Sequence, residues 1–276
     1  MVRAILLAAL LAVLPAAAGA ADCDAMFRDI GAPAYKGTPP PHEILCREGY
    51  VLSHNGDTKV PDWVLELLTP DRITGRADRN ALGNPFKPDP DLAAGQKPHA
   101  VLKDYRKSGC DRGHMAPAAD MKWSDPAMIE SFFLSNMAPQ EGPQFNRGIW
   151  ADLEDQTRRW IDERDRLVVI SGPIYDDTAR DSDLASRVKV SSHCQKEMIG
   201  DDVRVPTQFY KIVYSPTRNR VVAFVLPNRR LKGMDVADFR ASVRGIEELT
   251  GLDFFTKLSA RRQETLEARK KPMWRH

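Results

Sequence analysis

The stretch that decides the fold of this chain reads Asp111-Arg112-Gly113-His114-Met115-Ala116-Pro117. An imidazole titrates near pH ~6.5, so a neutral fraction that can accept a proton from water is present at pH 7. A lone histidine is more often a hydrogen-bonded structural residue. Here a carboxylate and a guanidinium group precede it, and Gly113 permits a close backbone approach that a side chain would obstruct. We therefore interpret His114 as a candidate general base and Asp111 as a supporting group.

A second set of polar residues follows, consisting of Asn136, Asn146, Glu154 and Arg158. Asn146 is expected at a helix start, where it serves either as an N-cap or as an amide oxygen ligand for a hard cation such as Mg²⁺. Glu154 and Arg158 are four residues apart, so they form an ordinary helix ion pair or face a common site. Glu154 could also hold a metal-bound water. With His114, this inventory suits hydrolysis of a phosphodiester.

The N-terminal segment has the pattern of a signal peptide. Arg3 is followed by an apolar run, and small residues lead to Asp22. The run is too short for a membrane anchor, and a mitochondrial presequence should be richer in Arg and Ser. We predict that residues 1–21 are a cleaved signal peptide, that the mature protein is periplasmic or secreted, and that no membrane attachment remains.

Export would place the four cysteines in an oxidising compartment, where they could form two disulfides. Three pairings are possible, and the pairing Cys23–Cys46 with Cys110–Cys194 is preferred because the first bridge would tie the N-terminal arm to the domain. No CxxC pair occurs, which argues against a structural zinc site.

Charge says little about partners, because the formal net charge is only +2. Residues 261–276 form a basic tail, and such a tail is usually a solvated helix end. Residues 22–44 look like an irregular arm, so residues 45–260 would hold the main domain. The sequence is compatible with a homodimer.

The local patterns predict a mixed α+β domain with strands in the centre. We expect strands at 50–53 and 167–172, a hairpin of 209–214 with 221–226, a short extended or helical element at 61–68, a long loop at 76–99, and helices at 126–133, 146–164 and 236–249. The last helix should end at Gly251 in a left-handed cap. Long loops in compact domains are frequently functional.

These residues resemble the DNA/RNA non-specific endonucleases, which include endonuclease G. Residues 111–117 are similar to the family's DRGHxxP signature, and Leu134-Ser135-Asn136-Met137-Ala138-Pro139-Gln140 is similar to its LSN-x-x-PQ segment. Asn146, Gly148 and Trp150, followed by Leu153-Glu154, match its N-x-G-x-W…LE helix. Further similarities occur at Gly172-Pro173, at 206–214 and at 250–252. The resemblance covers about residues 50–258.

The resemblance implies a ββα-metal (His-Me finger) fold, in which a central, mainly antiparallel sheet has flanking helices. It implies that His114 is the general base, that Asn146 is the direct metal ligand and that Glu154 orients water around the metal. Arg112 and Arg158 would lie near the phosphate, and Asn136 would be a supporting or substrate-positioning group. Arg79 would match an upstream arginine that stabilises the pentacovalent phosphate, with Arg76 as its competitor.

The expected activity is metal-dependent hydrolysis of DNA and RNA without sequence specificity, leaving 5′-phosphate ends. Mg²⁺ is the expected cofactor and Mn²⁺ a possible substitute. The alternative is a catalytically silent nucleic-acid-binding protein on the same fold, since fold alone does not give activity. Other exported hydrolases are disfavoured, because the chain has no HExxH, GxSxG or P-loop motif.

Overall fold

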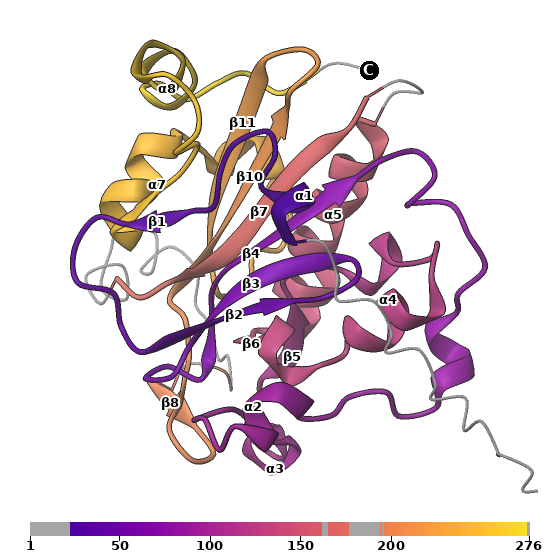
Figure 1. The fold of residues 1–276 in the computed structure, drawn as a ribbon. Coiled ribbons are helices and arrows are strands. Elements are labelled where there is room, and N and C mark those ends of the chain that lie inside the picture. Colours follow the sequence, from indigo (N-terminus) through magenta and orange to yellow (C-terminus); the bar gives the residue numbers. More distant parts are fainter. Residues whose placement is uncertain (1–22, 162–164, 177–193, 195, 275–276) are drawn as a thin grey trace, which may run out of the picture.

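A seven-stranded sheet forms the centre of the molecule in the computed structural model, which describes residues 23–161, 165–176, 194 and 196–274 (Figure 1). The strand order is β12-β11-β10-β7-β4-β3-β2, and each neighbouring pair is antiparallel. The strands are β2 His42–Cys46, β3 Tyr50–Asn55, β4 Val60–Leu68, β7 Leu167–Ile174, β10 Gln208–Ser215, β11 Arg220–Pro227 and β12 Arg240–Ala241. The predicted α+β class and the β10–β11 hairpin are confirmed.

Side chains point alternately to the two faces of the sheet along each strand, and an apolar core covers each face. Val64, Val169 and Val213 belong to the core on one face, whereas Leu65 and Ile170 belong to the core on the other. Helices α4 (Asp125–Glu130) and α5 (Trp150–Arg159) lie on the first side, and α7 (Val243–Thr250) and α8 (Ala260–Glu267) lie on the second (Figure 1). The candidate catalytic residues all come from the first side.

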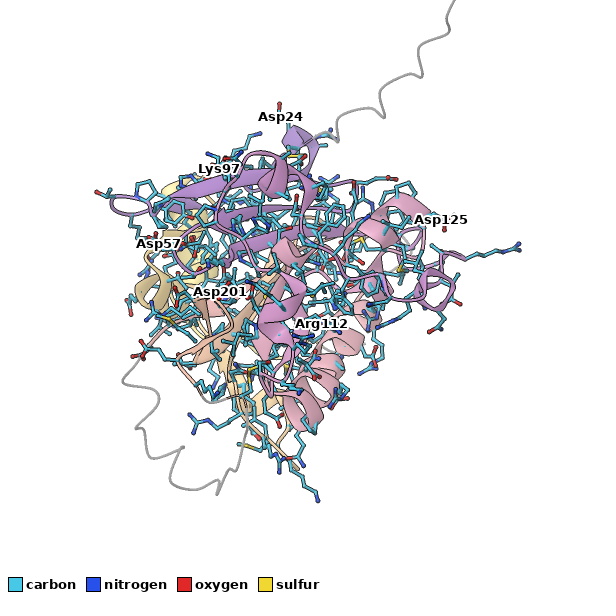
Figure 2. The ribbon with its side chains drawn as sticks, turned by 90° about the horizontal axis from the view of Figure 1, so that it is seen from below. Asp24, Asp57, Lys97, Arg112, Asp125 and Asp201 are labelled. Atoms are coloured by element: carbon cyan, nitrogen blue, oxygen red, sulfur yellow. A yellow bond between two sulfur atoms is a disulfide. The ribbon has the colours of Figure 1, made fainter. Side chains whose placement is uncertain are left out.

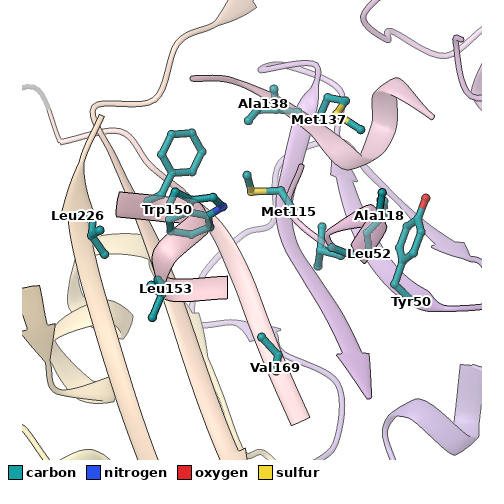
Figure 3. Close-up of a cluster of buried hydrophobic side chains, with 14 of the residues drawn as sticks. Tyr50, Leu52, Met115, Ala118, Met137, Ala138, Trp150, Leu153, Val169 and Leu226 are labelled. Carbon is teal, nitrogen blue, oxygen red and sulfur yellow. The ribbon is translucent and has the colours of Figure 1, made fainter. Parts of the chain in front are cut away.

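Two short strands and a helix form the unit that carries the candidate site. Strand β5 (Asp111–His114) pairs antiparallel with β6 (Met137–Gln140), and the chain then enters η4 (Gly142–Ile149) and α5. Trp150 and Leu153 of α5 are buried, and Figure 3 shows them facing Met115 and Val169 across the core. This apolar contact fixes α5 beside β5, which gives the ββα arrangement that the sequence predicts.

The helix predicted to run from Asn146 to about Arg164 has a different beginning and end. Its first part, η4, is a π-helical segment with a kink at Gly148, and the regular α-helix covers only α5. The Glu141 carboxylate accepts hydrogen bonds from the backbone N–H groups of Gln144 and Phe145. Glu141 therefore takes the role of N-cap, and the chain is already helical before it reaches Asn146.

The helix predicted at 236–249 is also interrupted. It divides into η6 (Val236–Phe239), the edge strand β12 and α7. The Ser242 hydroxyl accepts a hydrogen bond from the Gly245 N–H and so starts a new helix. Gly251 has φ 69°, which confirms the left-handed cap.

Both ends of the described chain are tied to the domain. The segment expected as an irregular arm contains α1 (Cys23–Met26), β1 (Ala34–Tyr35) and the edge strand β2, and β1 pairs with β13 (Leu252–Asp253). The described part of the basic tail packs against the domain at Trp274, which is 4% exposed and has its ring centroid 5.3 Å from that of Trp160. The preferred disulfide pairing is confirmed, with bridges Cys23–Cys46 and Cys110–Cys194.

The remaining elements surround the site or lie at the rim of the sheet. They are η1 Arg79–Leu82, α2 Pro90–Ala94, α3 Leu102–Tyr105, η2 Ala118–Asp120, η3 Leu134–Asn136, β8 Met198–Ile199 and β9 Val203–Arg204. The predicted loop at 76–99 thus contains two short helices, and buried Arg47 anchors it through Asp89 at 2.5 Å and Asp91 at 2.8 Å. Across the described ranges, no helix combines the length and apolarity that a membrane span requires. The predicted signal peptide lies outside the described residues.

Candidate active site

The close contact of β5 with β6 explains the glycine in the Asp111–His114 motif. A Cβ atom at Gly113 would lie 2.0 Å from the Gln140 Oε1 atom, far inside van der Waals contact. Gln140 is fully buried, so its side chain has no free space to move into. Glycine therefore lets the two strands pair at this distance and holds the flanking Arg112 and His114 at fixed positions.

Asp111 fixes the orientation of the Asn146 amide. The Nδ2 atom of Asn146 donates a hydrogen bond of 3.0 Å to Oδ2 of Asp111, and Nη1 of Arg147 donates to the same oxygen at 2.6 Å. Since the amide nitrogen is used in this bond, the amide oxygen is the atom left for another ligand. The structure thus places Asp111 beside the site as a support for Asn146.

A cleft of about 730 Å³ brings most of the predicted residues together. Six of the eight line it, namely Arg79, Asp111, Arg112, His114, Asn146 and Glu154. In the view from below, Arg112 lies among the pink segments of the middle of the chain (Figure 2). Arg79 lines the cleft and its competitor Arg76 does not. The imidazole and the amide, which come from different elements, therefore share one cavity.

His114 is held as a neutral base. Its Nε2 atom is buried without a hydrogen-bond partner, which leaves Nδ1 as the nitrogen that can serve the cleft. Burial, together with the positive charges of Arg79 and Arg112, lowers the pKa of His114 to about 3. A neutral imidazole is the form that can accept a proton, and these surroundings keep His114 in that form at pH 7.

This low pKa predicts a specific dependence of stability on pH. Because the folded pKa is about 3 and the ordinary value is 6.5, the unfolded chain binds more protons between these limits. The stability contributed by neutral His114 is complete above pH 6.5 and is lost as the pH falls through that window. We expect the melting temperature of the wild type to fall more between pH 7 and 4.5 than that of His114→Gln, measured by calorimetry in EDTA. Parallel curves for the two proteins would contradict the low pKa.

Glu154 faces the cleft without a hydrogen-bond or ion-pair partner among the described residues. Burial raises its pKa to about 7, while the neighbouring charge of Lys211 opposes this rise. The helix ion pair with Arg158, one of the two alternatives from the sequence, is not formed. Instead Arg158 donates from Nη1 to Oδ1 of Asp120 at 2.6 Å and also bonds Asp155.

Two of the predicted residues lie outside the cleft lining. Arg158 is bound to Asp120, which is 3% exposed. Asn136 is fully buried, and its amide exchanges hydrogen bonds with the backbone N–H and C=O of Ala116 and donates to the C=O of Ser131. These contacts place Asn136 behind the segment that follows His114, where it fixes the backbone.

Comparison with known proteins agrees with this geometry. The model of the DNA/RNA non-specific endonuclease family matches residues 31–261. The chain belongs to this family. It is 37% identical over 239 residues to the mitochondrial nuclease of Saccharomyces cerevisiae, covering 82% of this chain and 70% of that protein. It is also 36% identical to nuclease C1 of Cunninghamella echinulata, covering 78% of this chain and 84% of that protein.

A solved structure shows the same fold. It is the crystal structure of the EndoG/EndoGI complex, described in terms of the mechanism of EndoG inhibition, with a TM-score of 0.66 and 30% sequence identity. The match covers 82% of this chain and 91% of that chain. The nuclease therefore has the ββα-metal fold that its sequence predicts, and it is an enzyme of the DNA/RNA non-specific endonuclease class.

The relatives correct the prediction of a periplasmic or secreted location. The proteins that the nuclease matches include the mitochondrial nuclease of yeast and the mitochondrial endonuclease G of human and Caenorhabditis elegans. The prediction was wrong because it used only the composition of residues 1–21. An apolar segment at the N-terminus indicates targeting, but its composition alone does not identify the compartment.

Sequence reasoning missed several residues that line the cleft, among them Asn84, Phe86, Tyr105, Arg106 and Arg147. Asn84 and Phe86 belong to the 76–99 loop, whose length was the available signal. Arg147 follows Asn146 directly in the sequence, so a position close to the site could have been predicted for it. Arg106 lies at the end of α3, in a segment for which the sequence offered no comparable signal.

The donor set of the cleft fits a hard divalent cation. In the described part of the chain, no group of three or more His, Cys, Asp or Glu residues gathers to form a metal cage. The oxygen donors of the lining include the amide of Asn146 and the carboxylate of Glu154, which has no partner among the described residues. A cation such as Mg²⁺ keeps several waters and needs few protein ligands, so these two groups match its requirements.

Proposed function

We propose that this nuclease hydrolyses phosphodiester bonds of both DNA and RNA, without sequence preference, with the help of a divalent cation, and leaves 5′-phosphate ends. The observation that carries the proposal is the shared cleft of His114 and Asn146. The first residue offers a neutral ring nitrogen, and the second offers an amide oxygen whose orientation Asp111 fixes. A proton acceptor and a cation ligand on one cavity are what metal-assisted hydrolysis requires.

His114 would remove the proton from the water that attacks phosphorus. Its position on β5 is rigid, because the strand pairs with β6 and Gly113 packs against Gln140. The low pKa keeps the imidazole neutral at pH 7, so it is ready to accept a proton. Proton transfer to a positioned base typically contributes about 10² to 10⁴ in rate.

Arg79 and Arg112 would offset the negative charge that grows on the phosphate. Both line the cleft, and neither forms an ion pair with a carboxylate in the described ranges. Arg158 and Arg147 differ from them, since each is bound to an aspartate. A guanidinium group without a carboxylate partner can bind phosphate oxygens in a bidentate manner without first breaking an internal ion pair.

Asn146 would ligate the cation directly, and Glu154 would hold the cation's waters through its cleft-facing carboxylate. The bound cation, Mg²⁺ or Mn²⁺, would supply positive charge to the phosphate oxygens and to the departing oxygen. Asp111 contributes by holding the amide nitrogen of Asn146, so that the oxygen faces the cleft. Burial raises the pKa of Glu154, and the charge of Lys211 opposes this rise and so favours the ionised carboxylate that this role needs.

A lack of sequence preference follows from the kind of contact that the cleft can make. Its charged groups suit the phosphate backbone, and backbone contacts position a strand without reading its bases. The backbone is common to DNA and RNA, so both are expected as substrates. Binding should weaken with added salt, because each neutralised phosphate releases counterions.

Digestion of supercoiled plasmid and of a long RNA tests the proposal. We expect both to be cut in Mg²⁺ or Mn²⁺, and neither to be cut after EDTA removes the cation. The DNA fragments should be joined by a ligase without prior phosphorylation, which reports 5′-phosphate ends. The Asn146→Ala variant should bind Mn²⁺ more weakly than the wild type does, measured by calorimetry. A protein that binds nucleic acid but cuts neither substrate would be the catalytically silent alternative.

A further inference from the structure

The imidazole of His114 belongs to a cluster of three aromatic rings. Its centroid lies 5.0 Å from that of Phe132 and 5.8 Å from that of Phe86, and the two phenylalanines lie 5.0 Å from each other. The His114–Phe132 and Phe86–Phe132 pairs meet edge to face, with interplanar angles of 86° and 89°. Edge-to-face packing at these distances is a favourable aromatic geometry. The candidate base is therefore in contact with both rings.

The same two phenylalanines contact two of the cleft arginines, Arg112 and Arg79, which have no carboxylate partner among the described residues. The guanidinium of Arg112 lies 4.0 Å from the ring centroid of Phe86, and that of Arg79 lies 5.3 Å from the centroid of Phe132. Both distances are within the range of a cation–π attraction. This attraction holds a guanidinium group in place but leaves its N–H donors free for phosphate. Phe86 and Phe132 together thus contact the candidate base and the two guanidinium groups.

The backbone fixes the two phenylalanines relative to each other. The N–H of Leu134 donates to the C=O of Lys87 at 3.0 Å, and Lys87 forms a bridge with Phe133. These bonds join the residue after Phe86 to the residues after Phe132, although more than forty positions separate them in the sequence. Phe132 is fully buried, and Phe86 sits at the cleft wall. The ring pair is therefore a built feature of the cleft.

The environment of Nε2 gives Phe132 a distinct role. Nε2 is buried and has no hydrogen-bond partner, and the rings of His114 and Phe132 are nearly perpendicular with their centroids 5.0 Å apart. In this perpendicular packing a protonated Nε2 can direct its N–H at the face of Phe132, an interaction that a lone pair on Nε2 cannot make. The apolar surroundings should therefore favour the tautomer with the proton on Nε2. That tautomer leaves the lone pair of Nδ1 for a proton from the cleft.

We propose that Phe132 and Phe86 are positioning residues of this catalytic centre, in which Phe132 fixes the orientation and tautomer of His114 and the pair holds Arg79 and Arg112 beside the phosphate. The inference rests on the proposed function for its kinetic consequences. Its tautomer consequence is independent of activity. Phe132 acts mainly on the chemical step, through the base. Phe86 acts mainly on substrate binding, through Arg112.

Four variants separate these roles from simple packing. Phe132→Leu and Phe86→Leu remove the rings but keep apolar bulk, and Phe254→Leu is the matched control. Phe254 is also fully buried, but it packs with Tyr210 on the opposite face of the sheet. We expect Phe132→Leu to lower kcat about tenfold or more, since small displacements of a base are costly. Phe86→Leu should raise KM roughly fivefold, in line with the loss of a cation–π contact. Phe86→Trp should restore KM relative to Phe86→Leu.

The ¹⁵N chemical shifts of the His114 ring provide the second readout, with His114→Gln used for assignment. We expect a protonated Nε2 and a bare Nδ1 in the wild type and in Phe254→Leu, and a mixture of tautomers in Phe132→Leu. A wild type protonated on Nδ1 would overturn the inference. So would a Phe132→Leu variant that keeps both its kcat and its tautomer. Absence of cleavage by the wild type would instead refute the proposed function, and the tautomer result would stand alone.

Discussion

The His114→Ala variant is expected to lose about 10² to 10⁴ in kcat while it still binds nucleic acid. The loss follows from the position of the imidazole, which is the neutral ring nitrogen base of the cleft. Binding should persist because Arg79, Arg112 and Arg106 remain in the lining. Single-turnover cleavage of a short duplex measures the chemical step, and fluorescence anisotropy of the same duplex in Ca²⁺ measures binding.

His42→Ala is the matched control, since His42 is exposed on the edge strand β2 and lies outside the cleft lining. Its cleavage rate should equal that of the wild type. Added imidazole should partly restore the rate of His114→Ala, because the truncation leaves a ring-sized space beside Phe86 and Phe132. A variant that cleaves at nearly the wild-type rate without imidazole would remove His114 from the mechanism.

The fold could be predicted from the sequence wherever an apolar run or a turn signal was strong. The β10–β11 hairpin and strand β7 have continuous apolar patterns, and the left-handed cap at Gly251 was also visible. The helix starts were not, because they depend on particular side-chain caps. Glu141 starts η4 before Asn146, and Ser242 restarts a helix after β12. Several residue types can cap a helix, so the pattern alone does not show which one does.

The cleft could be predicted as far as its residues lie within motifs. Asp111, Arg112 and His114 come from strand β5, and Asn146 and Glu154 come from η4 and α5, so each group lies within one of the motifs that the sequence shows. The partners that occupy Asn136 and Arg158 were not predictable in this way. Asn136 bonds the backbone of Ala116, and Arg158 bonds Asp120, which lies 38 residues earlier. Such contacts arise only from tertiary packing.

Replacing Arg158 by methionine is expected to destabilise the nuclease by about 3 kcal/mol, because it leaves the carboxylate of Asp120 buried without a partner. Asp120 is 3% exposed, and the Arg158 side chain is 18% exposed, so water cannot easily replace the lost guanidinium. Urea unfolding followed by circular dichroism measures the change. Arg244→Met is the control, since Arg244 and its partner Glu264 are both largely exposed. The urea midpoint of this control should be unchanged.

The double variant Asp120→Asn/Arg158→Met separates the structural role of Arg158 from the predicted role near the phosphate. Removal of both charges takes away the unpaired buried carboxylate, so much of the lost stability should return. If Arg158 acts only through Asp120, the double variant should also recover kcat and KM, because Glu154 and the rest of α5 regain their support. If Arg158 leaves Asp120 to bind phosphate, stability should return but KM should stay raised, because the single and the double variant both lack the Arg158 guanidinium. Stability and KM would then separate, which would assign Arg158 a substrate contact that it does not make while bound to Asp120.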